Sequence, residues 1–294
     1  MSQRDAIQRA INQELQSADI PASVDMGQLE IPENLKVITE NPNSPQTLSE
    51  AFIERSCPLI SNPTILAHYT GPLAFKKIID SSELRLHRLL DRVHETEFAS
   101  FCEVHELKGH LQPVSGETEP HYKDLLRDLF YASFTPDHSV KESFAWSVFA
   151  RSGTGVKLVF RAQTIDHRAE LRPTFHSLGA KRPLPGVRSV AVRLLAEFDR
   201  SLILGGIGRL GAFFLPLGLG VEGEIRLLLN RCGDADVRDR VVGAGLDAYL
   251  PLPINRADEF CKLELIRIIP GPNSDRADLR DIISASPEFQ HLAW

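Results

Sequence analysis

The segment 221–226 places two carboxylates, Glu222 and Glu224, where an apolar loop passes into a strand-like run. The preceding residues, 202–221, are apolar but are interrupted by six glycines, a proline and an arginine. That composition disfavours a membrane-spanning helix, so we interpret the run as buried core. Residues two apart in an extended chain share a face, so we expect Glu222 and Glu224 to point the same way. Such a pair is typical either of a solvated strand entrance or of a site that meets cationic or hydroxyl-rich groups.

The composition limits the size of the core, the binding partners and the compartment that can be expected for this chain. A chain of 294 residues, 43% of them hydrophobic, can bury one large core or two small ones. The net charge of -6 provides no general attraction to nucleic acid or to an anionic membrane. No secretory signal opens the chain, and its four cysteines include no C-x-x-C pair. We therefore expect a cytoplasmic protein with reduced thiols and no membrane partner, which could still be delivered into a target cell.

Hydrophobic periodicity predicts a mixture of helices and strands. Residues 5–17 have the pattern of an amphipathic helix, and Thr47 begins a second, short helix with a capping box. We interpret residues 1–60 as a helical N-terminal appendage and residues 61–294 as the main domain. In that domain strands are expected at 64–70, 84–86, 131–135, 155–160, 224–230 and 262–269, and helices after Gly71-Pro72, after a capping box at 139–142, and over 187–204 and 274–285.

One glycine motif matches the residue pattern of a dinucleotide-binding fingerprint, but the sequence that follows it does not fit the helix that such a site requires. The segment Gly206–Gly211 fits G-x-G-x-x-G, which binds pyrophosphate when a strand precedes it and a long helix follows it. Pro216 and further glycines follow almost at once, so such a helix has no room. We interpret these glycines as a flexible or close-packed loop.

The cysteines and histidines of residues 87–121 could also be assembled into a metal site. Only the spacing of Cys102 and His105 is as tight as in common zinc sites, and the other candidates are His87, His94, His110 and His121. A charged, solvated insertion explains the segment better, so the sequence predicts no metal.

Three short polar motifs lie on or after the predicted strands. The segment His68–Thr70 ends the first strand, Ser133 and Thr135 share one face of a second, and Trp146 lies on the helix that follows. Each motif alone also has a structural explanation. The histidine could be a core residue with its hydrogen bonds satisfied, the Ser133–Thr135 strand an edge strand, and Trp146 a core residue. Together with the Glu222–Glu224 pair, they form an ordered series along the chain.

This series resembles the ADP-ribosyltransferase superfamily, whose members carry Arg or His, then a Ser-Thr-Ser-like motif, then Glu or Glu-x-Glu on successive core strands. More closely, the chain is similar to an uncharacterised, mostly bacterial family with colinear short motifs. The matches cover residues 64–285 and lie at 66–70, 133–135, 145–150 with 155–156, 222–226 and 268–272. Two departures concern the stretch 89–97 and the histidine after the family's Trp-Ser, which is Val148 here.

The resemblance implies an α+β fold, with ADP-ribosyltransferase-like split antiparallel sheets flanked by helices and a helical N-terminal appendage. It also implies that NAD is the substrate. Glu224 would bind the ribose 2′-hydroxyl and stabilise the ribose cation, and Glu222 would orient or deprotonate the acceptor.

The remaining implied roles concern NAD binding. His68, with Thr70 beside it, would hydrogen-bond the ribose on the nicotinamide side. Ser133 and Thr135 would brace the site and Glu224. Tyr69 or Trp146 would stack on nicotinamide.

The resulting hypothesis is a mono-ADP-ribosyltransferase-like glycosyltransferase, such as a bacterial toxin, effector or phage-defence enzyme. It would modify a macromolecule, with protein favoured over nucleic acid, and could have a neutralising or chaperone partner. Two alternatives remain open: an NAD glycohydrolase on the same fold, and a non-catalytic scaffold that binds a nucleotide or a partner protein.

Overall fold

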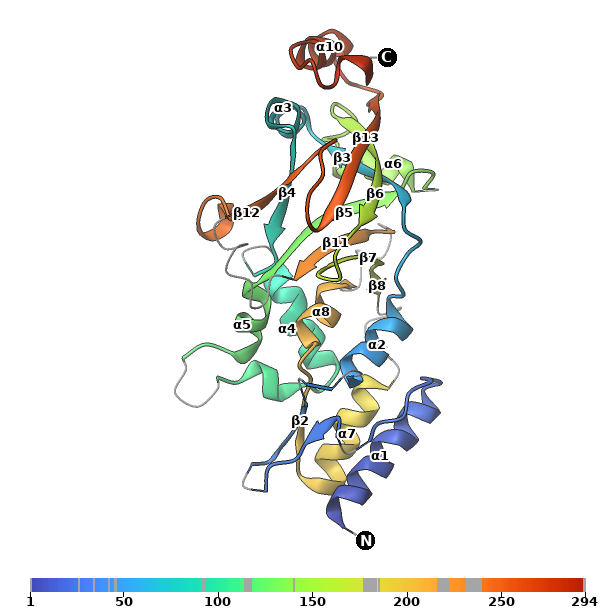
Figure 1. Ribbon diagram of the computed structural model, residues 1–294, viewed down its shortest axis with the longest axis vertical. Helices are drawn as coiled ribbons and strands as arrows, with labels where there is room; N and C mark the ends of the chain where they lie inside the picture. Colours follow the sequence, from blue (N-terminus) through green and yellow to red (C-terminus); the bar gives the residue numbers. More distant parts are fainter. Residues whose placement is uncertain are drawn as a thin grey trace. The chain divides into compact units, whose positions relative to one another are not determined.

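The protein chain forms two compact units (Figure 1). The first unit contains residues 1–58, 89–129 and 175–220, and the second contains residues 59–88, 130–174 and 221–294. A computed structural model describes residues 2–292 except 26, 34, 42, 45–46, 91–93, 114–117, 140, 177–183, 185, 216–222 and 231–239. In the part so described, no helix has the length and apolar character needed to cross a membrane.

The first unit is mainly helical. Helix α1 (Gln3–Ser17) buries the predicted stripe, which includes Ile7, Ile11 and Leu15, and Thr47 caps the next helix as expected. The other helices and strands are α2 (Leu48–Ser56), α4 (His94–Val104), η1 (Lys108–Leu111), α5 (His121–Arg127), α7 (Val187–Phe198), α8 (Ile207–Ala212), β1 (Leu29–Glu30), β2 (Val37–Glu40), β8 (Phe175–His176), β9 (Ser201–Ile203) and β10 (Phe214–Leu215). The order β1-β2-β9 makes one small sheet, and β8 pairs with β10 in another.

The second unit is a larger sheet flanked by helices. Its strands are β3 (Thr64–Thr70), β4 (Glu83–Arg88), β5 (Leu129–Pro136), β6 (Val156–Thr164), β7 (Ala169–Pro173), β11 (Ile225–Asn230), β12 (Tyr249–Pro253) and β13 (Cys261–Pro270). Its helices are α3 (Pro72–Ser81), α6 (Glu142–Val148), η2 (Gly245–Asp247), α10 (Arg276–Ser284) and η3 (Gln290–Leu292). The strand order is β12-β4-β5-β3-β6-β13, and β11 joins β5 to β7.

The sheet narrows to a short junction between β3 and β5. All strand pairs whose register is described in it are antiparallel, and β3 pairs with β6 along its whole length. With β5, however, β3 pairs only at Leu66 and Ala67, opposite Pro136 and Thr135. The chain is therefore mixed α+β, and its larger antiparallel sheet consists of two parts joined at β3 and β5.

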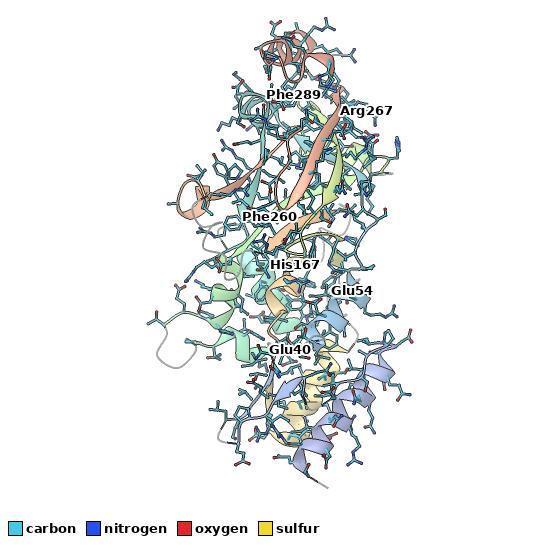
Figure 2. All side chains as sticks on the ribbon, in the orientation of Figure 1. Glu40, Glu54, His167, Phe260, Arg267 and Phe289 are labelled. Atoms are coloured by element: carbon cyan, nitrogen blue, oxygen red, sulfur yellow. The ribbon has the colours of Figure 1, made fainter. Side chains whose placement is uncertain are left out.

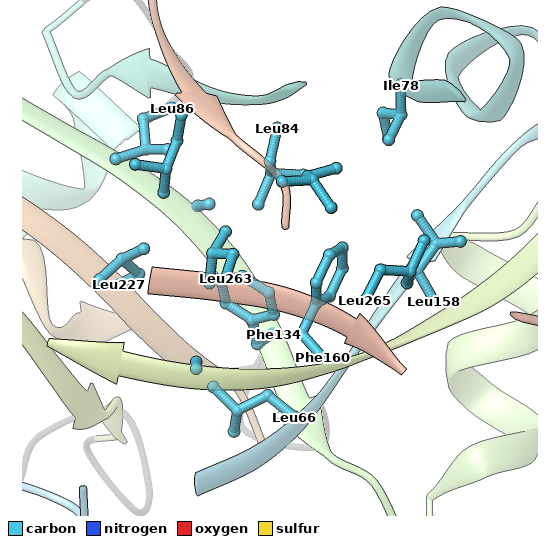
Figure 3. Packing of buried hydrophobic residues seen from close by; sticks show 14 of the residues in the cluster. Leu66, Ile78, Leu84, Leu86, Phe134, Leu158, Phe160, Leu227, Leu263 and Leu265 are labelled. Carbon is cyan, nitrogen blue, oxygen red and sulfur yellow. The ribbon is translucent and has the colours of Figure 1, made fainter. Parts of the chain in front are cut away.

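Alternation along the strands gives this sheet two different faces. One face carries Leu66, Phe134, Leu158 and Leu227, which pack in a single apolar core (Figure 3). Side chains of α3 and α10 cover this core. Because side chains alternate, the opposite face presents Tyr69 and the polar residues of β5 and β11. Helix α6 packs on that opposite face, through a small cluster around Ala145.

Most predicted elements are confirmed, and two expectations about element ends are wrong. The expected capping box at 139–142 is absent, because α6 begins after Lys141 with no side-chain cap and the Ser139 hydroxyl accepts from the Lys141 amide instead. The expected helix 187–204 ends at Phe198, where Asp199 adopts a left-handed conformation, and the apolar residues after it form β9. Residues 1–58 share the first unit with two later segments, so the predicted appendage is one part of a discontinuous body.

The glycine motif Gly206–Gly211 is closely packed, as expected, but it forms the short helix α8 and not a loop. A carboxylate of the chain itself occupies its entrance: the buried Glu40 accepts hydrogen bonds from the amides of Gly205 and Gly206 and from Ser49 (Glu40 is labelled in Figure 2). These donors satisfy a buried charge, so they stabilise the first unit.

Gly155 allows the loop before β6 to approach the end of β3. A β-carbon at this position would lie 2.0 Å from the carbonyl oxygen of Thr70. We expect Gly155→Ala to lower the free energy of unfolding by about 1–3 kcal/mol, because the backbone must move. Gly109→Ala is the control, since its added carbon would be 3.5 Å from its nearest neighbour. Urea denaturation that gives equal losses for the two variants would contradict this explanation.

Candidate functional site

A small pocket lies at the junction of β3 and β5. It is lined by residues 67–69 of β3, residues 133–135 of β5, Phe149 and Glu224, and its volume is about 70 Å³. Five of the residues singled out in the sequence, His68, Tyr69, Ser133, Thr135 and Glu224, therefore meet in one place. The junction itself explains the opening, since β3 and β5 stop pairing next to these residues.

Glu224 is held firmly at the entrance of β11. Its side chain is 6% exposed, and its Oε1 atom accepts hydrogen bonds from the Ser133 hydroxyl and from Nε of Arg226, the latter at 3.1 Å. The Glu224 carbonyl oxygen also accepts from the amide and hydroxyl of Thr174. Both the carboxylate and the backbone of this residue are thus fixed before any ligand binds.

Arg226 belongs to a buried group of four charges. It lies directly opposite Arg172 in the β11–β7 register, and Arg172 pairs with Glu170 at 2.6 Å. Each arginine thus pairs with a carboxylate two residues earlier in the chain. The Arg226 guanidinium also lies over the Tyr131 ring, 5.2 Å from its centroid. This arrangement balances the charges of an otherwise apolar region.

His68 faces the same pocket as a neutral ring. Its Nδ1 atom lies 2.9 Å from the carbonyl oxygen of Ser133, and its ring meets Phe134 edge to face. Desolvation lowers the pKa of His68, and the hydrogen bond to Ser133 opposes this effect only in part. A carbonyl oxygen only accepts, so Nδ1 carries the proton and Nε2 is left as an acceptor.

The two hydroxyls of β5 have different surroundings. The resemblance implied that both brace Glu224, but only the Ser133 hydroxyl bonds to it. The Thr135 hydroxyl is buried and has no hydrogen-bond partner in the described part of the chain. Thr70 and Trp146 do not line the pocket, although the Trp146 ring packs edge to face on Tyr69.

Glu222, the other carboxylate of the pair, lies outside the described residues. The expectation that it shares a face with Glu224 assumed an extended chain. The described residue between them, Gly223, has a φ of 59°, and β11 begins at Ile225.

A second buried network supports the pocket wall from β6. Lys157, only 4% exposed at its side chain, donates to the Asp137 carbonyl and to Glu142 Oε1, and Glu142 also accepts from the Tyr69 hydroxyl. Arg267 of β13, labelled in Figure 2, pairs with Asp137. Burial and the nearby Glu142 carboxylate raise the pKa of Tyr69. The sequence pattern did not predict this network, although Lys157 inside the apolar run 156–160 indicates that buried partners must exist.

Of the residues considered as metal ligands, His105 has both ring nitrogens engaged in hydrogen bonds to the backbone. His105 Nδ1 donates to the Phe101 carbonyl at 2.7 Å, and its Nε2 accepts from the Leu184 amide at 2.7 Å. Burial raises the pKa of the Cys102 thiol to about 12. Over the described residues, no group of three or more His, Cys, Asp or Glu side chains is arranged to hold a metal ion.

Two of these histidines make the first unit sensitive to acid. Burial lowers the pKa of His105 to about 4, and burial together with the neighbouring His121 lowers the pKa of His110 to about 3, from 6.5. As the pH falls from about 6.5 towards 4, the unfolded chain takes up protons first, so the stability contributed by the neutral rings is lost. We expect protection of the Leu184 and Leu204 amides, which bond to these rings, to fall over this range in hydrogen exchange corrected for intrinsic rates.

Matched histidine variants test that expectation. His105→Gln removes one titrating group and should flatten the pH dependence at Leu184. His167→Gln, at a side chain that is 91% exposed, should leave it unchanged. An equal pH dependence in the His105 variant and the wild type would contradict the assignment.

Compared with protein-family models, curated proteins and solved structures, the chain matches none.

Proposed function

We propose that this protein cleaves NAD between nicotinamide and ribose and transfers the ADP-ribose group to a macromolecule. The observation that carries the proposal is the fixed Glu224 carboxylate, which the Ser133 hydroxyl and Arg226 hold at the wall of a pocket shared with His68. A carboxylate positioned in advance in a desolvated site is what a developing positive charge requires.

The chemistry suits a site with these groups. When the bond between ribose C1′ and the nicotinamide nitrogen breaks, the electron pair leaves with nicotinamide, which becomes neutral. Positive charge builds on the ribose, as in glycoside cleavage, and a carboxylate beside it lowers the barrier. The acceptor then bonds to C1′ and loses its proton. Since the leaving ring starts as a cation, no strong general acid is required.

The size and walls of the pocket fit one end of NAD. A volume of about 70 Å³ corresponds to roughly five water molecules, so the pocket can take a ring and not a whole dinucleotide. Tyr69 and Phe149 supply aromatic walls, and His68 and Thr135 also line the pocket. In the proposed complex the nicotinamide ring enters the pocket, and the ribose lies against Glu224.

A second candidate function is ligand binding without catalysis. It is favoured by the burial of Glu224 and by its ion pair with the fully buried Arg226. Buried pairs of this kind also occur where a carboxylate only satisfies an arginine. A binding scaffold would use the same pocket but would not release nicotinamide.

Incubation with NAD distinguishes these functions. Purified protein is incubated with NAD, with and without cell lysate, and free nicotinamide is measured by mass spectrometry. Release that needs lysate, together with ADP-ribose on a lysate component, supports transfer to a macromolecule. Release without lysate indicates a glycohydrolase or self-modification. If no nicotinamide is released in either case, although NAD binds, the scaffold is supported and the proposed reaction is wrong.

A further inference from the structure

Thr135 lines the pocket, and the described residues leave its hydroxyl without a hydrogen bond. Thr135 is 5% exposed, and its Oγ1 atom is buried without a hydrogen-bond partner among the described residues. A buried hydroxyl without a partner costs about 1–3 kcal/mol of desolvation, so such groups usually serve a ligand or a water molecule. The Ser133 hydroxyl already donates its hydrogen bond to Glu224, whereas the Thr135 hydroxyl remains to bond a ligand.

The other polar atoms of the pocket are acceptors. The hydrogen bond from His68 Nδ1 to the Ser133 carbonyl leaves Nε2 with a lone pair, and no described residue donates to it. Glu224 adds a negative charge to the same pocket. Thr135 can either donate or accept. A ligand group that only accepts hydrogen bonds would therefore meet two unfavourable neighbours.

We infer that this pocket selects a flat, uncharged ring bearing a hydrogen-bond donor, such as a carboxamide, and rejects the matching carboxylate, with Thr135 as a specificity-determining residue. The inference deepens the proposed function, on which it rests for the identity of the ring. Tyr69, Phe134 and Phe149 provide the aromatic walls. A carboxamide NH₂ can donate to His68 Nε2 while its oxygen accepts from Thr135. A carboxylate cannot donate, and Glu224 repels it.

Direct binding of nicotinamide and nicotinate tests the inference without any turnover. Both ligands are titrated at pH 7 into the full chain, and chemical shifts are followed by NMR. We expect nicotinamide to bind in the millimolar range, as a fragment of this size does, and nicotinate to bind at least about tenfold more weakly. Equal binding of the two, or no binding of nicotinamide at millimolar concentrations, would overturn the inference.

Three variants assign the selectivity to Thr135. Thr135→Val keeps the shape and should weaken nicotinamide binding about three- to tenfold, while Thr135→Ser should restore it to within about twofold. Thr64→Val, at the start of β3 and outside the pocket, is the control and should bind as the wild type does. If Thr135→Val binds nicotinamide as tightly as the wild type does, Thr135 does not determine the specificity of the pocket.

The failure of the inference and the failure of the proposed function are distinguishable. If the protein binds nicotinamide selectively but does not cleave NAD, the inference stands and the proposed reaction is wrong. If the protein cleaves NAD in a Glu224-dependent reaction but binds nicotinate and nicotinamide equally tightly, the proposed reaction stands and the inference is wrong.

Discussion

Glu224→Gln is expected to lower the rate of nicotinamide release from NAD by about 10²–10³-fold. Glutamine has nearly the same volume but carries no charge, so it cannot stabilise the positive charge that develops on ribose. The rate is measured with saturating NAD, by mass spectrometry of free nicotinamide. Full activity in a folded Glu224→Gln protein would show that this carboxylate is not the catalytic group.

The buried partner of Glu224 makes a second variant necessary. Glu224→Gln leaves the charge of Arg226 without its carboxylate, so part of any loss could come from local unfolding. The double variant Glu224→Gln/Arg226→Met removes both charges and should recover the fold. It should remain as inactive as the single variant, because stability returns without the carboxylate. Recovery of activity in the double variant would mean that Glu224 acts only by neutralising Arg226.

Arg226→Met alone is expected to cost about 3–5 kcal/mol of the free energy of unfolding. This substitution leaves Glu224 buried with a negative charge and removes one member of the four-charge group on β7 and β11. Urea denaturation followed by tryptophan fluorescence measures the loss, since both tryptophans, Trp146 and Trp294, belong to the second unit. The double variant Glu224→Gln/Arg226→Met should regain most of it, since a neutral pair needs no compensation.

An exposed ion pair in the same unit provides the comparison. Arg161 and Glu264 are paired across β6 and β13 at 3.0 Å, with side chains 51% and 39% exposed. Water screens this pair, so Arg161→Met should cost less than about 1 kcal/mol. Equal costs for Arg161→Met and Arg226→Met would contradict the view that burial makes the Glu224–Arg226 pair important.

Sequence patterns predicted the elements that have a clear period. The alternation of apolar residues in 156–160 and the capping residue Thr47 each marked an element that the structure contains. The helix expected over 187–204 was too long, because a left-handed residue at Asp199 ends α7 and the apolar residues that follow form a strand. Periodicity alone does not separate these outcomes for short apolar runs.

Candidate site residues were predictable where a polar group interrupts a strand pattern. His68, Ser133 and Glu224 were found in this way, and they line one pocket. Individual partners were harder to predict. The sequence treated Ser133 and Thr135 alike, but only the Ser133 hydroxyl reaches Glu224. The partners of Lys157 were missed entirely, since Asp137 and Glu142 are 20 and 15 residues away along the chain.

The sequence by itself determined the strands with a clear alternation, such as β6, and which of their faces is apolar, because the two-residue period of a strand is a local property. Only the tertiary structure decided that β3 and β5 pair over two residues and then separate, which opens the pocket beside Glu224. It also decided which hydroxyl holds that carboxylate and which is left for a ligand. These outcomes depend on the register between strands that are distant in sequence, and register is set by the packing of the whole sheet.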